Sequence, residues 1–134
     1  MSKKISFEKE KHLLNNETMD TLHKEFIDIF NSIEILSSEN FINKLSEILA
    51  HTKKHFSIEE EFMDKTSYPS IKEHKDEHNK VLAEMQYFLD NTNSNIGKKM
   101  LKAYYLEKLP EWFDLHLLSM DSDLAAHLKD IKLS

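Results

Sequence analysis

The chain has 134 residues, a formal net charge of −6 and no cysteine. The lack of cysteine excludes disulfides, thiolate metal sites and cysteine nucleophiles, and an acidic chain without a basic stripe is not typical of a nucleic-acid-binding protein. One glycine, two prolines and 40% hydrophobic residues favour a single domain of long helices spanning residues 1–134.

Residues 1–15 show no sustained apolar period, and we expect them to form an N-terminal arm. Charged residues are scattered through MSKKISFEKEKHLL, which is typical of neither a signal peptide nor a membrane span. These features predict a soluble cytoplasmic protein that has no membrane partner.

The first two helices are predicted from apolar stripes of helical period. One stripe begins at Met19, behind an N-cap at Asn15 or Asn16. The second occupies residues 41–63, after a turn and a new cap in the sequence SerSerGluAsn. Both stripes are long enough to bury one face of a helix.

Three side chains that can bind metal interrupt these stripes. His23 lies at the edge of the first stripe or within it, and His55 and Glu59 stand in the second where apolar residues are expected. Burying an unpaired carboxylate is costly, so Glu59 predicts a partner, and a metal ion is the simplest one. The adjacent Glu60 and Glu61 are expected on a solvated face.

The third helix is predicted to start at the Tyr68–Pro69 break, because proline is tolerated in a first turn but not in a helix interior. Its apolar stripe covers residues 71–89 and again contains two histidines, His74 and His78. The polar sequence at 91–95 is predicted to be a linker.

Two pairs of residues four apart have the spacing of metal ligands. Such residues lie about 40° apart around a helix, so His55 with Glu59, and His74 with His78, can each aim two ligand atoms at one point. Imidazole and carboxylate groups together suit iron, zinc or manganese.

The fourth helix is predicted from about Gly97, with a kink at Pro110 where the carbonyl of Leu106 loses its hydrogen-bond donor. Asp121 follows His116 by five residues, which is about 140° around a regular helix. If both bind one cluster, the helix must end or loosen between them. The inward-facing residues expected on this helix are Met100, Leu101, Tyr104, Tyr105, Leu109, Trp112, Phe113, His116 and Met120.

A short C-terminal helix containing Leu124, Leu128 and Ile131 is expected to close the end of the molecule. Four amphipathic segments with short connections predict an all-α fold, an antiparallel up-down-up-down four-helix bundle.

Four blocks of this sequence, MDTLH, HFSIEEEFM, YPSIKEHKDEH and WFDLHLLSMD, resemble the bacterial hemerythrins. That resemblance covers about residues 17–131 and implies a bundle that binds dioxygen at two iron ions joined by an oxo or hydroxo bridge. The family's five histidines, one glutamate and one aspartate would fall on His23, His55, Glu59, His74, His78, His116 and Asp121.

The resemblance also implies how the ligands are divided. His74, His78 and His116 would bind one iron and His23 and His55 the other, while Glu59 and Asp121 would bridge them. One coordination position would stay open on the two-histidine iron.

Five side chains are expected to line that open position: Phe26, Phe56, Trp112, Phe113 and Leu117. Most of them lie next to a ligand or one turn from one. The remaining histidines, His12, His51 and His127, are interpreted as non-ligands, of which His51 is the nearest alternative because it stands one turn before His55.

The favoured function is reversible dioxygen binding for storage, delivery or scavenging by a monomeric protein that is not an enzyme. Di-iron oxygenases and ferritins in similar bundles use Glu-x-x-His motifs and mostly carboxylates, which this chain does not supply. The alternatives are a di-iron enzyme that reduces peroxide or nitric oxide, a donor of iron for iron–sulfur repair, an oxygen sensor, or a bundle without metal.

Overall fold

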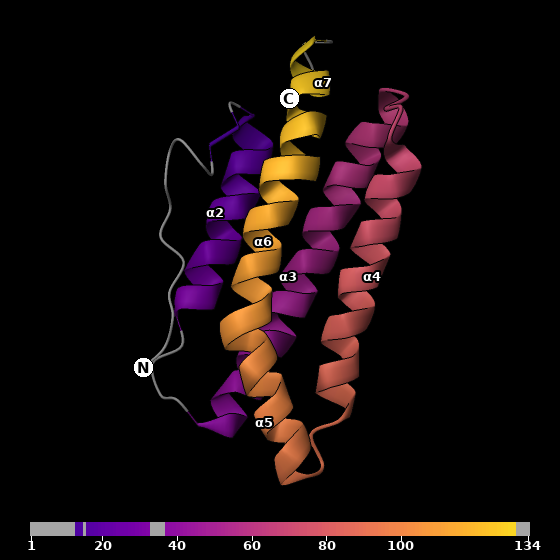
Figure 1. Ribbon diagram of the computed structural model, residues 1–134. Helices are drawn as coiled ribbons and strands as arrows, with labels where there is room; N and C mark the ends of the chain where they lie inside the picture. The colour runs from indigo at the N-terminus through magenta and orange to yellow at the C-terminus, as the bar shows by residue number, and fades with distance from the viewer. Residues whose placement is uncertain (1–12, 15, 33–36, 131–134) are drawn as a thin grey trace.

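The computed structural model describes residues 13–14, 16–32 and 37–130, and all regular structure in these ranges is helical (Figure 1). The first three helices are α2 (Glu17–Asn31), α3 (Ser38–Lys65) and α4 (Ile71–Asp90). The predicted all-α bundle is confirmed. The expected N-terminal arm lies almost entirely outside the described residues.

The fourth helix is a continuous run of five helical segments. They are α5 (Asn95–Ala103), η1 (Tyr104–Lys108), α6 (Leu109–His116), η2 (Leu117–Asp121) and α7 (Ser122–Asp130), of which η1 and η2 are π-helical. The short C-terminal helix α7 therefore continues directly from the turns before it. Its predicted residue Ile131 lies outside the described residues.

Neighbouring helices run antiparallel, as their colours in Figure 1 indicate. Where two neighbouring helices touch, residue numbers rise along one helix as they fall along the other. The contacting pairs are Glu25 with His51, His23 with His55, Glu60 with His78, Asp64 with Lys75, Phe30 with Tyr105, and His23 with Asp121. Each helix therefore turns its buried stripe toward the inside of the bundle.

Side-chain caps define where three of the helices begin. Asn16 accepts a hydrogen bond from the backbone N–H of Met19, and Ser37 and Ser94 cap α3 and α5 in the same way. Asn16 is therefore the first N-cap, one of the two residues expected. The fourth helix starts at Asn95, two residues before the predicted Gly97, because Ser94 supplies the cap.

The apolar stripes form the core, with one exception. The prediction that Met100 faces inward on the fourth helix is wrong, because its side chain is 48% exposed. Gly97, Leu101 and Tyr104 take the inward direction on this segment. Met100 precedes Leu101 by one residue, which turns it about 100° away from the core.

A π-helical turn stands where the sequence predicts a kink. In η1 the N–H of Leu109 donates to the carbonyl of Tyr104, five residues back, and Pro110 follows in the first turn of α6. Proline has no N–H to donate, so a change of hydrogen-bond register just before it accommodates the missing bond. The helix continues through Pro110.

A second, smaller apolar cluster closes the end of the bundle near α7. It consists of Met19, Met63, Tyr68, Leu124, Ala125 and Leu128. His127 lies beside it and contacts the carbonyl and hydroxyl oxygens of Thr66. The predicted role of Leu124 and Leu128 in closing this end is confirmed.

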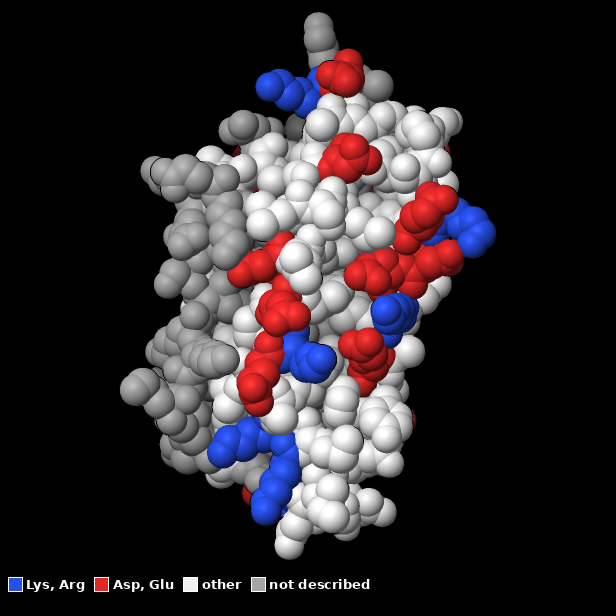
Figure 2. Space-filling view, viewed as in Figure 1, with Lys and Arg blue, Asp and Glu red and all other residues white. Residues whose placement is uncertain are grey.

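The described helices include none long and apolar enough to cross a membrane. On the face drawn in Figure 2, acidic and basic side chains are interspersed among the described residues, without a continuous basic stripe. The charge pattern of this face agrees with the acidic composition.

Gly97 is required where the linker after α4 returns against α5. A Cβ atom added there would lie 1.8 Å from the backbone carbonyl oxygen of Asn91. In the interior of an ordinary helix, a Gly→Ala substitution raises the free energy of unfolding by about 1 kcal/mol. Because the clashing atom is backbone, Gly97→Ala should instead lower the free energy of unfolding by about 1–3 kcal/mol, as measured by denaturant unfolding. An unchanged or raised value would contradict this packing.

Candidate metal centre

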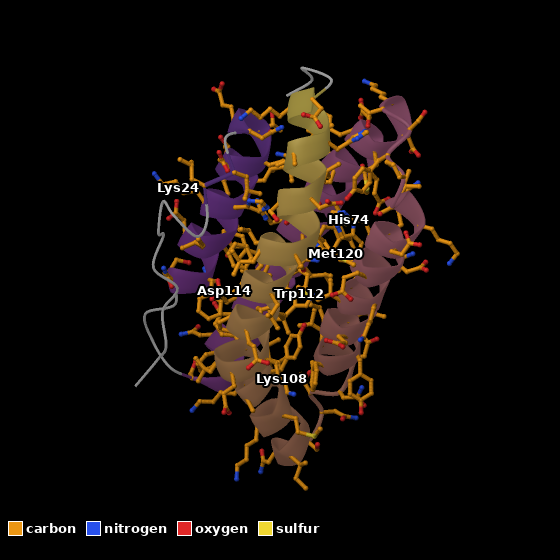
Figure 3. The ribbon with its side chains drawn as sticks, turned by 45° about the horizontal axis from the view of Figure 1, so that its top comes forward. Lys24, His74, Lys108, Trp112, Asp114 and Met120 are labelled. Carbon is orange, nitrogen blue, oxygen red and sulfur yellow. The ribbon has the colours of Figure 1, made fainter. Side chains whose placement is uncertain are left out.

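All four helices contribute buried polar side chains to one point inside the bundle. Each of the residues is at most 4% exposed. They are His23 from α2, His55 and Glu59 from α3, His74 and His78 from α4, His116 from α6 and Asp121 from η2. Figure 3 labels one of them, His74, and also Trp112, whose ring stacks on that of another, His116. The structure thus brings together all seven residues that the sequence comparison with hemerythrins suggested.

These side chains form two overlapping groups, in each of which the potential ligand atoms all lie within 4.8 Å of one another. One group combines His74, His78 and His116 with both carboxylates, and the other combines His23 and His55 with both carboxylates. Glu59 and Asp121 belong to both groups. The two groups of potential metal ligands therefore share both carboxylates.

Each carboxylate directs one oxygen toward each group. Oε1 of Glu59 lies 3.2 Å from Nε2 of His78, and Oε2 lies 2.5 Å from Nε2 of His55. Oδ1 of Asp121 lies 3.2 Å from Nε2 of His116, and Oδ2 lies 2.9 Å from Nε2 of His23. A carboxylate with its two oxygens divided in this way is oriented to bridge two metal ions.

The electrostatics of the cluster keep both carboxylates ionised. Burial and the neighbouring Asp121 raise the pKa of Glu59, but the nearby His55 and His74 together outweigh them and lower the pKa below the usual range. Burial likewise raises the pKa of Asp121, and His116 with the other histidines lowers it well below the usual value. Burial lowers the pKa of His74, yet the nearby carboxylates of Asp121 and Glu59 raise it to about 9.

Several ligand atoms have no hydrogen-bond partner among the described residues. These atoms are Nε2 of His74, His78 and His116, Oε1 of Glu59 and Oδ1 of Asp121. A buried polar atom without a partner costs about 1–3 kcal/mol, and a cation bound at this point would satisfy all of them. The donor set of imidazole nitrogen and carboxylate oxygen therefore fits a first-row metal such as iron.

The π-helical segment η2 explains how His116 and Asp121 reach the same cluster. The N–H of Ser122 donates to the carbonyl of Leu117, five residues back. With this hydrogen-bonding pattern, residues five apart lie about one turn apart instead of on different faces. The expectation that the helix loosens between His116 and Asp121 is confirmed.

Glu60 takes part in the site although its position predicted a solvated side chain. Its carboxylate lies 3.0 Å from Nδ1 of His78, on the opposite side of the ring from the cluster, and is only 31% exposed. Such an outer partner holds a ligand histidine in one orientation and favours the tautomer with a free Nε2. A one-helix pattern could not reveal it, because the contact joins α3 to α4.

The remaining described histidines belong to neither ligand group, although the ring of His51 packs edge-on against that of His55, with centroids 6.1 Å apart. His51 contacts Glu25 at 3.1 Å on the bundle surface, and burial lowers its pKa. His127 contacts Thr66 near the end of the bundle. His12 lies outside the described residues.

A small cavity of about 10 Å³ adjoins the cluster. Its lining residues are Phe26, Thr52, His55, Phe56, Trp112, Phe113, His116 and Asp121. Four of the five expected pocket residues line it, but Leu117 does not: it is fully buried in the main apolar core. Thr52 was not expected to line the cavity, although it stands one turn before His55 on the same stripe.

Stacked rings hold the cavity wall and two of the imidazoles. Phe26 and Phe113 stack with centroids 4.4 Å apart. Phe56 stacks on His78 at 3.6 Å, and Trp112 stacks on His116 at 4.9 Å. The indole N–H of Trp112 also donates to Glu77 at 3.3 Å, which ties the cavity wall to α4.

The fold and the site define a helical bundle with a buried metal-binding centre of histidine and carboxylate ligands. Residues 14–128 match the family model described as the hemerythrin HHE cation-binding domain. The chain belongs to the hemerythrin family.

Curated relatives carry the name bacteriohemerythrin. The protein from Ralstonia nicotianae is 29% identical over 111 residues, which cover 81% of this chain and 77% of that protein. The Aquifex aeolicus protein is 25% identical over 87% of this chain and 92% of its own length, and a Campylobacter jejuni protein is 32% identical over 54% and 59%. No solved structure matches the chain significantly.

Substitution of a candidate ligand histidine should lower the metal content of the protein, whereas substitution of a non-ligand histidine should not. His55→Ala or His74→Ala should lower metal affinity by more than the roughly 10–100-fold that loss of an outer partner costs. His51→Ala and His127→Ala should leave it unchanged, since neither residue supplies an atom to either ligand group. Metal analysis of the purified variants measures this. Metal loss in the second pair, with retention in the first, would falsify the assignment.

Proposed function

We propose that the chain binds dioxygen reversibly at a di-iron centre, for oxygen storage, delivery or scavenging. The observation that carries the proposal is the division of ligands: three histidines in one group and two in the other, with both carboxylates shared. The bacteriohemerythrin names of the relatives support it.

In this proposal His74, His78 and His116 would hold one iron, and His23 and His55 would hold the other. Glu59 and Asp121 would serve both, consistent with the way each carboxylate directs one oxygen to each group. When bound, a ferrous pair would supply the two electrons that dioxygen takes up. The group with two histidines has one imidazole fewer than the other, so an iron held there would have room for a small molecule.

The side chains around this position act by excluding water. Phe26, Phe56 and Phe113 line the cavity with apolar rings, and each is at most 3% exposed. Reversible binding requires that water and protons do not reach the site while dioxygen is held. The small cavity volume admits little besides a small molecule.

Ligand charge distinguishes this function from di-iron enzymes. Five imidazoles, which are neutral when they bind a metal, stabilise highly oxidised iron less well together with only two carboxylates than a carboxylate-rich set does, so oxidation of a substrate is disfavoured. The alternatives are reduction of peroxide or nitric oxide, donation of iron, and oxygen sensing.

The test is anaerobic reduction of the iron-loaded protein followed by exposure to air. A carrier should hold about two irons per chain and form a coloured adduct that disappears when oxygen is removed, over repeated cycles. Optical spectroscopy with iron quantification measures both. Turnover with peroxide or nitric oxide, without a reversible adduct, would identify an enzyme instead.

The ring of Phe113 should control how long the oxygenated protein survives. Phe113→Ala removes a ring that stacks on Phe26 and lines the cavity, so water and small anions should enter. The expected result is autoxidation and azide binding that are faster by about tenfold, with unchanged iron content, measured by optical spectroscopy.

Phe41→Ala is the matched control, because Phe41 is fully buried in the same core but does not line the cavity. It should lower stability by about 3–5 kcal/mol and leave the autoxidation rate near that of the parent. Equal autoxidation rates in the Phe113 variant and the parent would show that Phe113 does not guard the site.

A further inference from the structure

Thr52 has a hydroxyl in a cavity wall that is otherwise aromatic or part of the candidate metal centre. It is 1% exposed and stands on α3, one turn before His55. It lines the same cavity as Phe26 and Phe113. No other lining residue carries a hydroxyl.

The Oγ1 atom of Thr52 has no hydrogen-bond partner within the part of the chain that the structure describes. A helical threonine usually satisfies its hydroxyl by donating to a backbone carbonyl three or four residues earlier. Thr66 does this, with its hydroxyl 2.8 Å from the carbonyl oxygen of Phe62. Thr52 is therefore a buried donor that is not used within its own helix.

The other polar side chains of the cavity wall are bonded elsewhere or belong to the candidate metal centre. The indole N–H of Trp112 donates to Glu77. His55, His116 and Asp121 are members of the candidate metal centre. The Thr52 hydroxyl is thus the polar group of this wall that lies outside the metal centre and has no hydrogen-bond partner among the described residues.

The size of the cavity limits the molecule that could use this donor. A volume of about 10 Å³ lies at the lower limit for one water molecule. A small diatomic or linear ligand that is anchored at the metal centre would extend into this space. An acceptor atom on such a ligand would meet a buried donor whose hydrogen bond is not weakened by competing water.

We propose that the Thr52 hydroxyl is a positioning and selectivity group, which donates a hydrogen bond to the small ligand held in this cavity. The inference rests on the proposed di-iron function, since a metal ion must anchor the ligand. The favoured ligands are small molecules with an acceptor atom, azide among the anions and dioxygen among the neutral gases. Thr52 would act through the bound ligand and not as a metal ligand.

The experiment compares azide binding to the ferric, iron-loaded parent with binding to Thr52→Val and Thr52→Ser. Valine keeps the shape of threonine and removes the donor, so the dissociation constant should rise about tenfold. Serine keeps the donor, and its dissociation constant should stay within about threefold of the parent. Optical titration gives the constants.

Thermal melting without azide supplies a readout that is independent of ligand binding. Thr52→Val should melt at the same temperature as the parent or higher, because it removes a buried hydroxyl that has no partner. Thr66→Val is the matched control: it loses the hydrogen bond to Phe62, so it should melt lower and bind azide like the parent. If Thr52→Val does not fold, Thr52→Ala removes the same donor.

The outcomes separate this inference from the proposed function. An iron-loaded parent that does not bind azide overturns both. If azide binds as tightly to Thr52→Val as to the parent, only the role of Thr52 is overturned. The role of Thr52 is also overturned if Thr52→Ser loses as much azide affinity as Thr52→Val. A lower melting temperature for Thr52→Val, with unchanged azide affinity, would show a hydroxyl used only for packing.

Discussion

The rest of this structure depends on the burial of two carboxylates among five imidazoles. Glu59 and Asp121 are fully enclosed, and each directs its two oxygens to two different groups of histidines. Buried charges persist in a protein interior only when they are paired or coordinate a metal. Because the ligands come from all four helices, satisfying these two groups fixes the rotation and the longitudinal register of every helix in the bundle.

Two departures from regular helical geometry make this arrangement possible. The π-helical turn η2 brings Asp121 onto the same face as His116, and the turn η1 accommodates Pro110 without ending the helix. Both lie in the fourth helix, which supplies part of the cavity wall and two of the candidate ligands from one uninterrupted run. Single π-helical turns within α-helices often occur at functional sites for this reason.

Around the ligands, aromatic stacking and outer hydrogen bonds turn a polar cluster into an ordered site. Phe56 stacks on His78, whose Nδ1 contacts Glu60, so one imidazole is held on its face and at its far nitrogen. Trp112 stacks on His116 and bonds to Glu77 on α4. The side chains that exclude water from the cavity thus also orient the ligands, and a change at one of them affects both properties.

The sequence by itself determined the helical stripes, the residues at which metal-binding groups interrupt them, and the need for the helix to loosen before Asp121, because these follow from local spacing of three to five residues. Only the tertiary structure decided that Glu60 supports His78, that Thr52 and not Leu117 lines the cavity, and that Met100 faces outward. Each of these depends on how one helix is rotated against its neighbours. That rotation is set by packing and ligand contacts between residues distant in sequence, which a local period does not contain.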